Sequence, residues 1–225
     1  MALTGTGAVA IWHDIQPEGR DDFYAWHGIE HMPERAAIPG FVRGRRYVAI
    51  EGRPEFFNLY ETRSTEVLAG ADYLKRLNAP TPWTIATVKH FRDVARSLCE
   101  VEASFGSGDG GLIATFRYDI ASVNAQAHRA NMRTRLEALT REPGIAGAHL
   151  LVANDAASSI ETAERRARQG TTDVPRWIVL VESWGDCEPF VMFVRELQRD
   201  AMFDEASIAP DWAVYRLQNA CASDD

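Results

Sequence analysis

The stretch PGFVRGRRYVAIEGRPEFFNLYET, residues 39–62, determines the fold that this chain is expected to adopt. Apolar and aromatic residues dominate two runs within it, 41–51 and 55–62, and such a composition favours β-strands. The three residues between the runs, Gly-Arg-Pro, are typical of a tight turn. The stretch therefore predicts a β-hairpin.

Helical and extended patterns flank this hairpin and then recur in the same order. In the first half we expect a strand at 8–15, a helix at 20–34, the hairpin, a helix at 64–77, a loop at 78–82 and a strand at 94–105. After a glycine-rich linker at 104–111, we expect strands at 112–120, 146–153, 177–183 and 212–219, with helices at 124–141 and 188–199. Residues 156–174 form a polar insertion in the second half, which we expect to be a surface excursion.

Short landmarks in the sequence also recur, which indicates an internal duplication. Asp14-Ile15 matches Asp119-Ile120, Pro39-Gly40-Phe41 matches Pro143-Gly144-Ile145, and Leu59-Tyr60-Glu61 matches Leu180-Val181-Glu182. A βαββαβ unit covers only one face of its sheet with helices, so the other apolar face needs a partner. The sequence thus predicts an α+β fold with two tandem ferredoxin-like units, 1–105 and 106–225, whose antiparallel sheets pack as one dimeric-type α/β barrel.

Composition excludes several classes of protein. The net charge is −8 and the pI is about 5.3, so the basic footprint of a nucleic-acid-binding protein is absent. Three scattered cysteines suggest a reducing compartment rather than a disulfide framework. The N-terminus lacks the pattern of a signal peptide, and no apolar run reaches the roughly 18 residues of a membrane span. We therefore expect a cytoplasmic protein with neither nucleic-acid nor membrane partners.

Residues 26–35, WHGIEHMPER, contain the densest polar cluster. His27, Glu30 and His31 have the spacing of an inverted zinc-peptidase motif, in which two imidazoles one helical turn apart bind the metal. No third ligand is visible from spacing, and Pro33 disturbs the helix, so we expect no bound metal. The simplest alternative is a solvated helix face with charge pairs at i, i+4 spacing.

The cluster also carries a resemblance to a known family. The run Trp26-His27-x-x-Glu30-His31-x-Pro33-Glu34-Arg35, followed by Pro39-Gly40-Phe41, resembles the EthD-like branch of the dimeric α/β-barrel superfamily. The resemblance covers residues 8–103 well, whereas the second half agrees in pattern only. It implies that His31, Glu30, Glu34 and Arg35 are site residues, and it leaves the reaction open because one fold hosts many functions.

Other candidates lie outside that cluster. His13 stands near the end of the first strand, where it can line a pocket or bond to a nearby carbonyl group. Each of the remaining candidates also has a purely structural interpretation, as a loop residue or as a core tyrosine. They are Trp83, His90 and Arg92 near the last strand of the first half, and Tyr47 and Tyr60 on the hairpin strands.

Two functions are consistent with these observations. The first is a small-molecule enzyme or accessory protein of catabolic or secondary metabolism. It would bind an apolar aromatic or carbonyl compound in the barrel and use His31 or His13 for acid–base chemistry without a cofactor. Glu30 or Glu34 would orient the histidine, and Arg35 or Arg92 would hold an anionic group. The resemblance leaves haem open, because relatives of this barrel class include haem-binding enzymes, but no residue marks a proximal ligand. The second is a non-catalytic binding or assembly module with a structural His-Glu-Arg network. In both, the barrel forms within the chain, and a further homodimer stays open.

Overall fold

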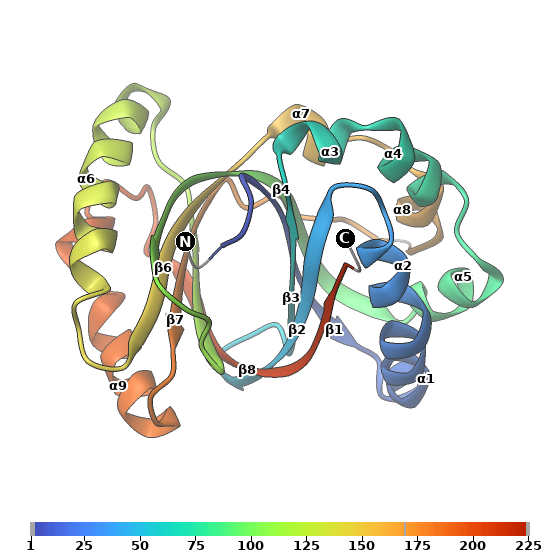
Figure 1. Cartoon of the computed structure of the whole chain (residues 1–225), viewed down its shortest axis with the longest axis horizontal. Coiled ribbons are helices and arrows are strands. Elements are labelled where there is room, and N and C mark those ends of the chain that lie inside the picture. The colour runs from blue at the N-terminus through green and yellow to red at the C-terminus, as the bar shows by residue number, and fades with distance from the viewer. Residues whose placement is uncertain (1–2, 169, 224–225) are drawn as a thin grey trace.

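The computed structural model, which describes residues 3–168 and 170–223, contains a closed barrel of eight antiparallel strands with helices outside it (Figure 1). The strands follow one another around the barrel in the order β1-β3-β2-β8-β5-β7-β6-β4. Four strands of each half form one ferredoxin-like sheet, and the two sheets meet where β2 pairs with β8 and β4 pairs with β6. The predicted fold class is therefore confirmed, and the barrel is closed within one chain.

Most strand bounds lie within one or two residues of those expected from the sequence. The strands are β1 Gly7–Ile15, β2 Phe41–Glu51, β3 Phe56–Thr62, β4 Phe91–Gly106, β5 Leu112–Tyr118, β6 Ile145–Ala153, β7 Trp177–Ser183 and β8 Asp211–Ala222. The helices are α1 Arg20–Trp26, α2 Met32–Ala36, α3 Thr65–Ala69, α4 Ala71–Asn78, α5 Pro82–Val88, α6 Ala125–Leu139, α7 Asp155–Ser158, α8 Ala163–Arg168 and α9 Cys187–Leu197.

The strand registers repeat between the halves. In the first half Val9, Ile11 and His13 of β1 pair with Tyr60, Asn58 and Phe56 of β3, and in the second half Ala114, Phe116 and Tyr118 of β5 pair with Val181, Val179 and Trp177 of β7. The β2–β3 and β6–β7 pairings also have matching registers. These registers show, position by position, which residues of the two halves correspond. Superposition of 7–104 on 111–219 and the division at residue 105 stay predictions.

Alternation along each strand separates the barrel interior from the outer faces. Ala8, Ala10 and Trp12 of β1 are buried inside the barrel. The Trp12 indole N–H donates to the hydroxyl of Thr115, on β5, at 3.2 Å. The alternate residues Val9, Ile11 and His13 consequently face the helices that cover the outside.

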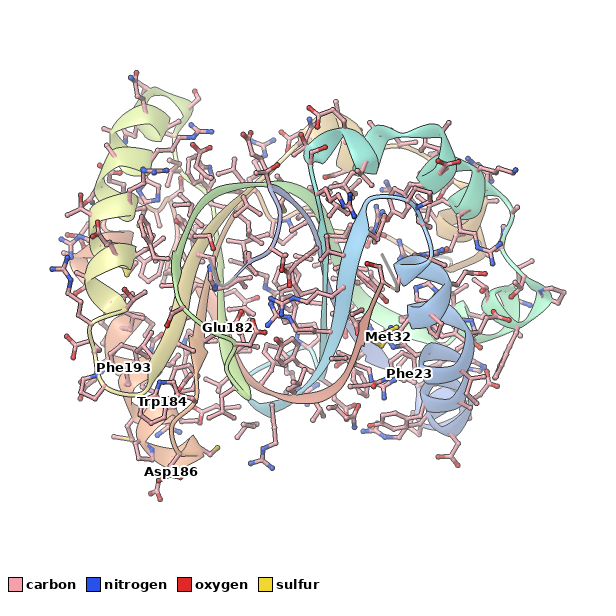
Figure 2. All side chains as sticks on the ribbon, viewed as in Figure 1. Phe23, Met32, Glu182, Trp184, Asp186 and Phe193 are labelled. Atoms are coloured by element: carbon pink, nitrogen blue, oxygen red, sulfur yellow. The ribbon has the colours of Figure 1, made fainter. Side chains whose placement is uncertain are left out.

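A charged network also lies in the barrel. Arg45 of β2 donates to Glu182 of β7 at 2.9 Å and to Glu61 of β3 at 3.0 Å, and all three side chains are buried. Figure 2 shows Glu182 pointing into the barrel. His149 of β6, the register equivalent of Arg45, lies 3.5 Å from Glu182. The matched glutamates noticed in the sequence therefore converge on one arginine.

Four sequence predictions about helices need correction. The helix expected at 20–34 contains a π-helical turn at His27–His31 between α1 and α2, and the helix expected at 64–77 is broken at Gly70, whose ψ of 154° is not helical. The third is an omission: the loop expected at 78–82 is present at 79–81, but the helix α5 that follows it was not predicted. Thr81 caps α5 by accepting a hydrogen bond from the Thr84 amide.

The fourth correction concerns the insertion at 156–174. Its helix α8 does not project into solvent but packs against α4 and α5 of the first half (Figure 1). Its polar composition suggested exposure, yet Glu164 forms an ion pair with Arg35 of α2, and the Ala163 amide donates to the Asn78 side chain at 3.1 Å. In the described part of the chain, no helix is long and apolar enough to span a membrane.

Candidate functional site

Polar residues gather in a small cavity between the outer face of the first sheet and the helices that cover it. The cavity measures about 30 Å³, which is room for about one or two water molecules. Strands β1 and β3, helices α1 and α5, the π-helical turn and helix α8 all contribute to its wall. The lining residues are Ile11, His13, Trp26, His27, His31, Asn58, Tyr60, Val88, Phe91, Glu164 and Arg168.

The π-helical turn positions two of the three histidines. The segment between the Asp-Ile and Pro-Gly landmarks is one residue longer in the first half than in the second. A π turn is a one-residue insertion into an α-helix and is frequent at functional sites. It lies at His27–His31, whereas α6, the corresponding helix of the second half, is uninterrupted. The rings of His27 and His31 stack with their centroids 5.4 Å apart and line the cavity together.

His27 uses both of its ring nitrogens within the protein. The guanidinium of Arg46 donates to Nδ1 at 3.3 Å, so Nδ1 carries no proton. Nε2 then holds the proton of the neutral ring and donates to the Tyr60 hydroxyl at 3.3 Å. Burial lowers the pKa of His27 well below its ordinary value, and the charges of nearby basic groups lower it further. His27 is therefore a neutral, fully engaged side chain.

His13 is engaged in a similar way. Its Nδ1 lies 3.4 Å from the carbonyl oxygen of Asp14, and its Nε2 lies 3.0 Å from the amide nitrogen of Asn58. Phe91 packs edge-on against the ring at 4.2 Å. Burial lowers the pKa of His13 to about 3. The Oδ1 atom of Asn58 is buried without a hydrogen-bond partner, so one acceptor of this pair is left unused.

His31 differs from the other two histidines because its Nδ1 atom is buried and has no hydrogen-bond partner. The residue is 6% exposed, and the centroid of its ring lies 4.2 Å from the ring centroid of Trp26. Burial lowers the pKa of His31 well below its ordinary value, and the charge of Arg35 adds to the effect. The His31 ring is therefore buried while its Nδ1 atom lacks a hydrogen bond.

Helix α8 of the second half closes the cavity. Glu164 forms an ion pair with Arg35 of α2, which ties α8 to the first half. Arg168, at the end of α8, is 9% exposed and lines the cavity. Burial and the neighbouring charge of Arg96 lower the pKa of Arg168 to about 10, so its guanidinium stays charged at neutral pH.

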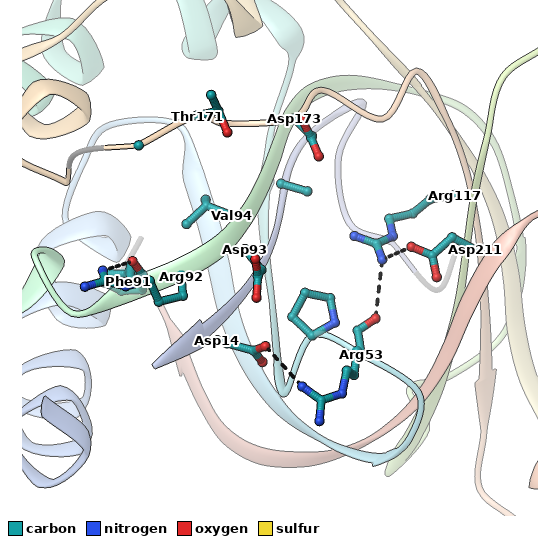
Figure 3. Close-up of a pocket in the computed structure, with 13 residues that line it drawn as sticks. Asp14, Arg53, Phe91, Arg92, Asp93, Val94, Arg117, Thr171, Asp173 and Asp211 are labelled. Carbon is teal, nitrogen blue, oxygen red and sulfur yellow. Dashed lines mark hydrogen bonds and ion pairs between the residues drawn. The ribbon is translucent and has the colours of Figure 1, made fainter. Parts of the chain in front are cut away.

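A larger basin lies directly outside the cavity, at one end of the barrel (Figure 3). Its volume is about 650 Å³, within the range of small-molecule sites. Asp14, Arg53 and Arg117 are among the charged residues that line it, and Phe91 lines both the basin and the cavity. Phe91 is therefore the residue that the two spaces share.

The structure brings three of the predicted site residues to the cavity, namely His31, His13 and Tyr60. Tyr47 points instead into the barrel, where it is buried against Phe57. Its position follows from strand alternation, because Tyr47 and the cavity-facing positions of the hairpin point to opposite faces.

The predicted orientation of His31 by Glu30 or Glu34 is absent. Glu30 accepts a hydrogen bond from the hydroxyl of Thr81 at 2.6 Å and so holds the start of α5. Glu34 pairs with Arg76 and with Arg35, and Arg35 pairs with Glu164, so this His-Glu-Arg run ends in an ion-pair network next to the cavity.

Three further candidates also lie outside the cavity. The Trp83 indole donates to Asp22 at 2.8 Å, and the ring of His90 packs on Gly19. The Arg92 guanidinium donates to the carbonyl oxygens of Lys89 and Phe91, and Arg92 lines the outer basin.

Sequence reasoning missed several lining residues. Nothing in the sequence links Glu164 and Arg168 with a site more than a hundred residues away. Asn58, in contrast, was marked by the sequence pattern: it is a polar residue on a strand in which both neighbours, Phe57 and Leu59, are apolar.

A bound metal or haem has little to hold it here. In the described residues, no group of three or more His, Cys, Asp or Glu side chains is placed to hold a metal ion. A haem does not fit, because the rings of Trp26, His27 and His31 fill the space between the helix and the sheet.

Comparison with known proteins supports the fold alone. No protein-family model matches the chain, and no curated protein matches it. Among solved structures, an anthrone oxidase-like protein is 11% identical with a TM-score of 0.65, and the alignment covers 97% of this chain and 93% of that protein. A monooxygenase candidate from Lactobacillus acidophilus is 10% identical, with a TM-score of 0.56 and 96% of each chain covered. A chlorite dismutase variant from Candidatus Nitrospira defluvii is 10% identical with a TM-score of 0.55, covering 96% of this chain and 92% of that one. These neighbours share the dimeric α/β-barrel fold, and the EthD-like assignment stays a prediction.

Proposed function

We propose that this protein is a small-molecule enzyme that uses His31 to remove a proton from its substrate in the cavity of the first half. The observation that carries the proposal is the unpartnered Nδ1 atom of this neutral, buried imidazole. His27 and His13 have partners at both nitrogens, so His31 is the imidazole best able to accept a proton.

The chemistry of such a step is simple. The C–H or O–H bond of the substrate breaks, its proton moves to His31, and the electron pair stays on the substrate as an enolate or phenolate. The imidazolium then returns the proton to the product, so the chain itself ends unchanged. Asn58, with an unused acceptor and an amide next to His13, can orient a substrate hydroxyl group.

The aromatic and apolar part of the wall supports an aromatic or carbonyl compound as substrate. Ile11, Trp26, Val88 and Phe91 provide this part. Since the cavity alone is too small, the reactive end of the substrate would enter it past Phe91 while the remainder lies in the outer basin. The proposed protein acts in catabolic or secondary metabolism and is located in the cytoplasm. It belongs to the EthD-like branch, an assignment that the Glu-His-x-Pro-Glu-Arg run supports.

The alternative of a structural His-Glu-Arg network applies to a different set of side chains. Glu34, Arg35, Arg76 and Glu164 form ion pairs that fasten α8 and α4 to α2. None of these pairs includes His31. The network therefore supports the site from outside and does not replace the proposed enzyme.

Anthrone is a suitable probe, because one structural neighbour is an anthrone oxidase-like protein. Its methylene protons are acidic, and their exchange for deuterium in D₂O under nitrogen can be followed by NMR. We expect the protein to accelerate this exchange and His31→Ala to reduce the acceleration by about 10²–10⁴-fold.

His90→Ala is the matched control, because His90 lies in the same half but outside the cavity. We expect this variant to behave as the wild type does. Equal exchange rates for wild type and His31→Ala, with both proteins folded, would contradict the proposal, as would a wild type that leaves the exchange rate of anthrone unchanged.

A further inference from the structure

The guanidinium of Arg168 lies buried beside three neutral imidazoles without a counter-ion. Its one side-chain hydrogen bond among the described residues is to the Thr172 hydroxyl at 3.0 Å. No carboxylate of the described chain lies within ion-pair distance of it, and Glu164, which lines the same cavity, pairs with Arg35 instead. A buried charge without a partner is unfavourable, so this arrangement calls for an explanation.

The surroundings of Arg168 are also more basic than the rest of the protein. Arg96 donates to the Tyr73 hydroxyl at 2.8 Å and adds positive charge near Arg168. The chain as a whole carries a net charge of −8. A local excess of positive charge in an acidic protein favours the binding of an anion at this position.

Two unpartnered acceptors, His31 Nδ1 and Asn58 Oδ1, are buried in side chains that line the same cavity. A ligand that fits must therefore offer a hydrogen to the acceptors and negative charge to the guanidinium. The apolar and aromatic part of the wall excludes a strongly hydrated inorganic ion as the best match. An aromatic compound that carries an anionic oxygen satisfies all of these conditions.

We propose that Arg168, supplied by the second half, binds the anionic oxygen of an aromatic carboxylate, phenolate or enolate substrate in the site of the first half. This inference rests on the proposed function and names its substrate class. If His31 removes a proton, the negative charge that remains on the substrate oxygen lies against the guanidinium, which stabilises it in a site from which water is excluded.

The geometry also explains why the insertion crosses to the other half. The ion pair between Glu164 and Arg35 anchors α8, and four residues later Arg168 reaches the cavity. Gly170, Thr171 and Asp173, from the loop that follows α8, line the outer basin. One segment thus borders both spaces that the substrate would occupy.

The test compares two probes of nearly equal shape, 1-naphthoate and its neutral amide 1-naphthamide, by isothermal titration calorimetry. We expect the wild type to bind naphthoate at least about tenfold more tightly, which corresponds to about 1.4 kcal/mol. Arg168→Gln should abolish this preference, and Arg168→Lys should keep part of it because the charge remains.

Arg165→Gln is the matched control, because Arg165 lies on the same helix and binds Glu161 and the Ser158 carbonyl rather than the cavity. It should keep the preference. His31→Ala should also keep it while losing proton exchange, so a wild type that prefers naphthoate but does not exchange protons contradicts the proposed function alone. The role of Arg168 would be overturned if the wild type bound both probes equally or bound neither. It would also be overturned if folded Arg168→Gln kept the preference unchanged, or if folded Arg168→Lys lost it completely.

Discussion

The two halves of the molecule place different side chains at equivalent positions between helix and sheet. The second half fills this layer mainly with apolar residues around one Tyr118–His128 pair, and the first half places more polar residues there. The equivalent pairs, with the first half named before the second, are Arg46 and Leu150, Asn58 and Val179, Tyr60 and Val181, and His13 and Tyr118. The equivalent layer of the second half packs well without these four polar residues of the first half. The fold therefore does not require them.

His128, the histidine that lies between helix and sheet in the second half, helps to define the contrast. His128 of α6 is fully buried, accepts a hydrogen bond from the Tyr118 hydroxyl at 2.8 Å and bonds to Glu205 at 2.8 Å. Both of its nitrogens have partners, which is the usual state of a buried polar side chain. His31 breaks this rule, and residues that break local rules tend to lie at functional sites.

The largest expected effect on stability comes from Arg45, which binds one buried glutamate from each half. Arg45→Met should lower the free energy of unfolding by about 3–5 kcal/mol, because it leaves the buried carboxylate of Glu182 without its arginine and leaves Glu61 with Arg43 alone. Urea denaturation measures the change. A loss below about 1 kcal/mol would show that the network does not hold the barrel together.

Exchanging equivalent residues between the halves should change the free energy of unfolding by unequal amounts. Val179→Asn places an amide in the apolar layer of the second half, and we expect a loss of at least about 2 kcal/mol. Asn58→Val should change the free energy of unfolding by less than about 1 kcal/mol, because the buried Asn58 already has an unsatisfied oxygen. Equal losses from the two substitutions would remove the contrast between the halves.

The acid dependence of stability should reflect Glu182. Burial raises the pKa of this carboxyl group, but the hydrogen bond from His149 and the charge of Arg45 outweigh burial and lower it to about 2. A lowered pKa in the folded state gives a stabilisation that is present above the pKa of the unfolded chain and is lost as the pH falls from about 4.5 to about 2. Unfolding measured across this range should show a steeper loss for wild type than for Glu182→Gln.

The smallest expected effect is on protonation in the site. NMR of ¹⁵N-labelled histidine at pH 5.5 should show His31 and His13 neutral, because burial lowers the pKa of each. Elemental analysis should find no stoichiometric zinc, and His27→Ala should not alter the metal content. One zinc per chain, lost in that variant, or a charged His31 at pH 5.5, would contradict the description of the site.

The fold was predictable because alternation and turn residues act locally. The hairpin at 39–62 and the recurring landmarks were enough for the barrel, and Pro39-Gly40 marked the start of β2 within one residue. The site was predictable only in part. The π-helical turn at His27–His31 has no local sequence signature beyond a length difference of one residue. Arg168 reaches the cavity through tertiary packing of a polar insertion, which no pattern of spacing reveals.

The most direct test of the account is a paired measurement on His31→Leu, which places in the first half the type of residue that α6 carries at Leu136. Its urea midpoint and its rate of anthrone proton exchange would be compared with those of the wild type. The account predicts a midpoint equal to or above that of the wild type, because a partnerless buried nitrogen is removed, together with a loss of exchange of about 10²–10⁴-fold. A variant that unfolds more easily while keeping its exchange rate would contradict the claim that His31 serves chemistry rather than the fold.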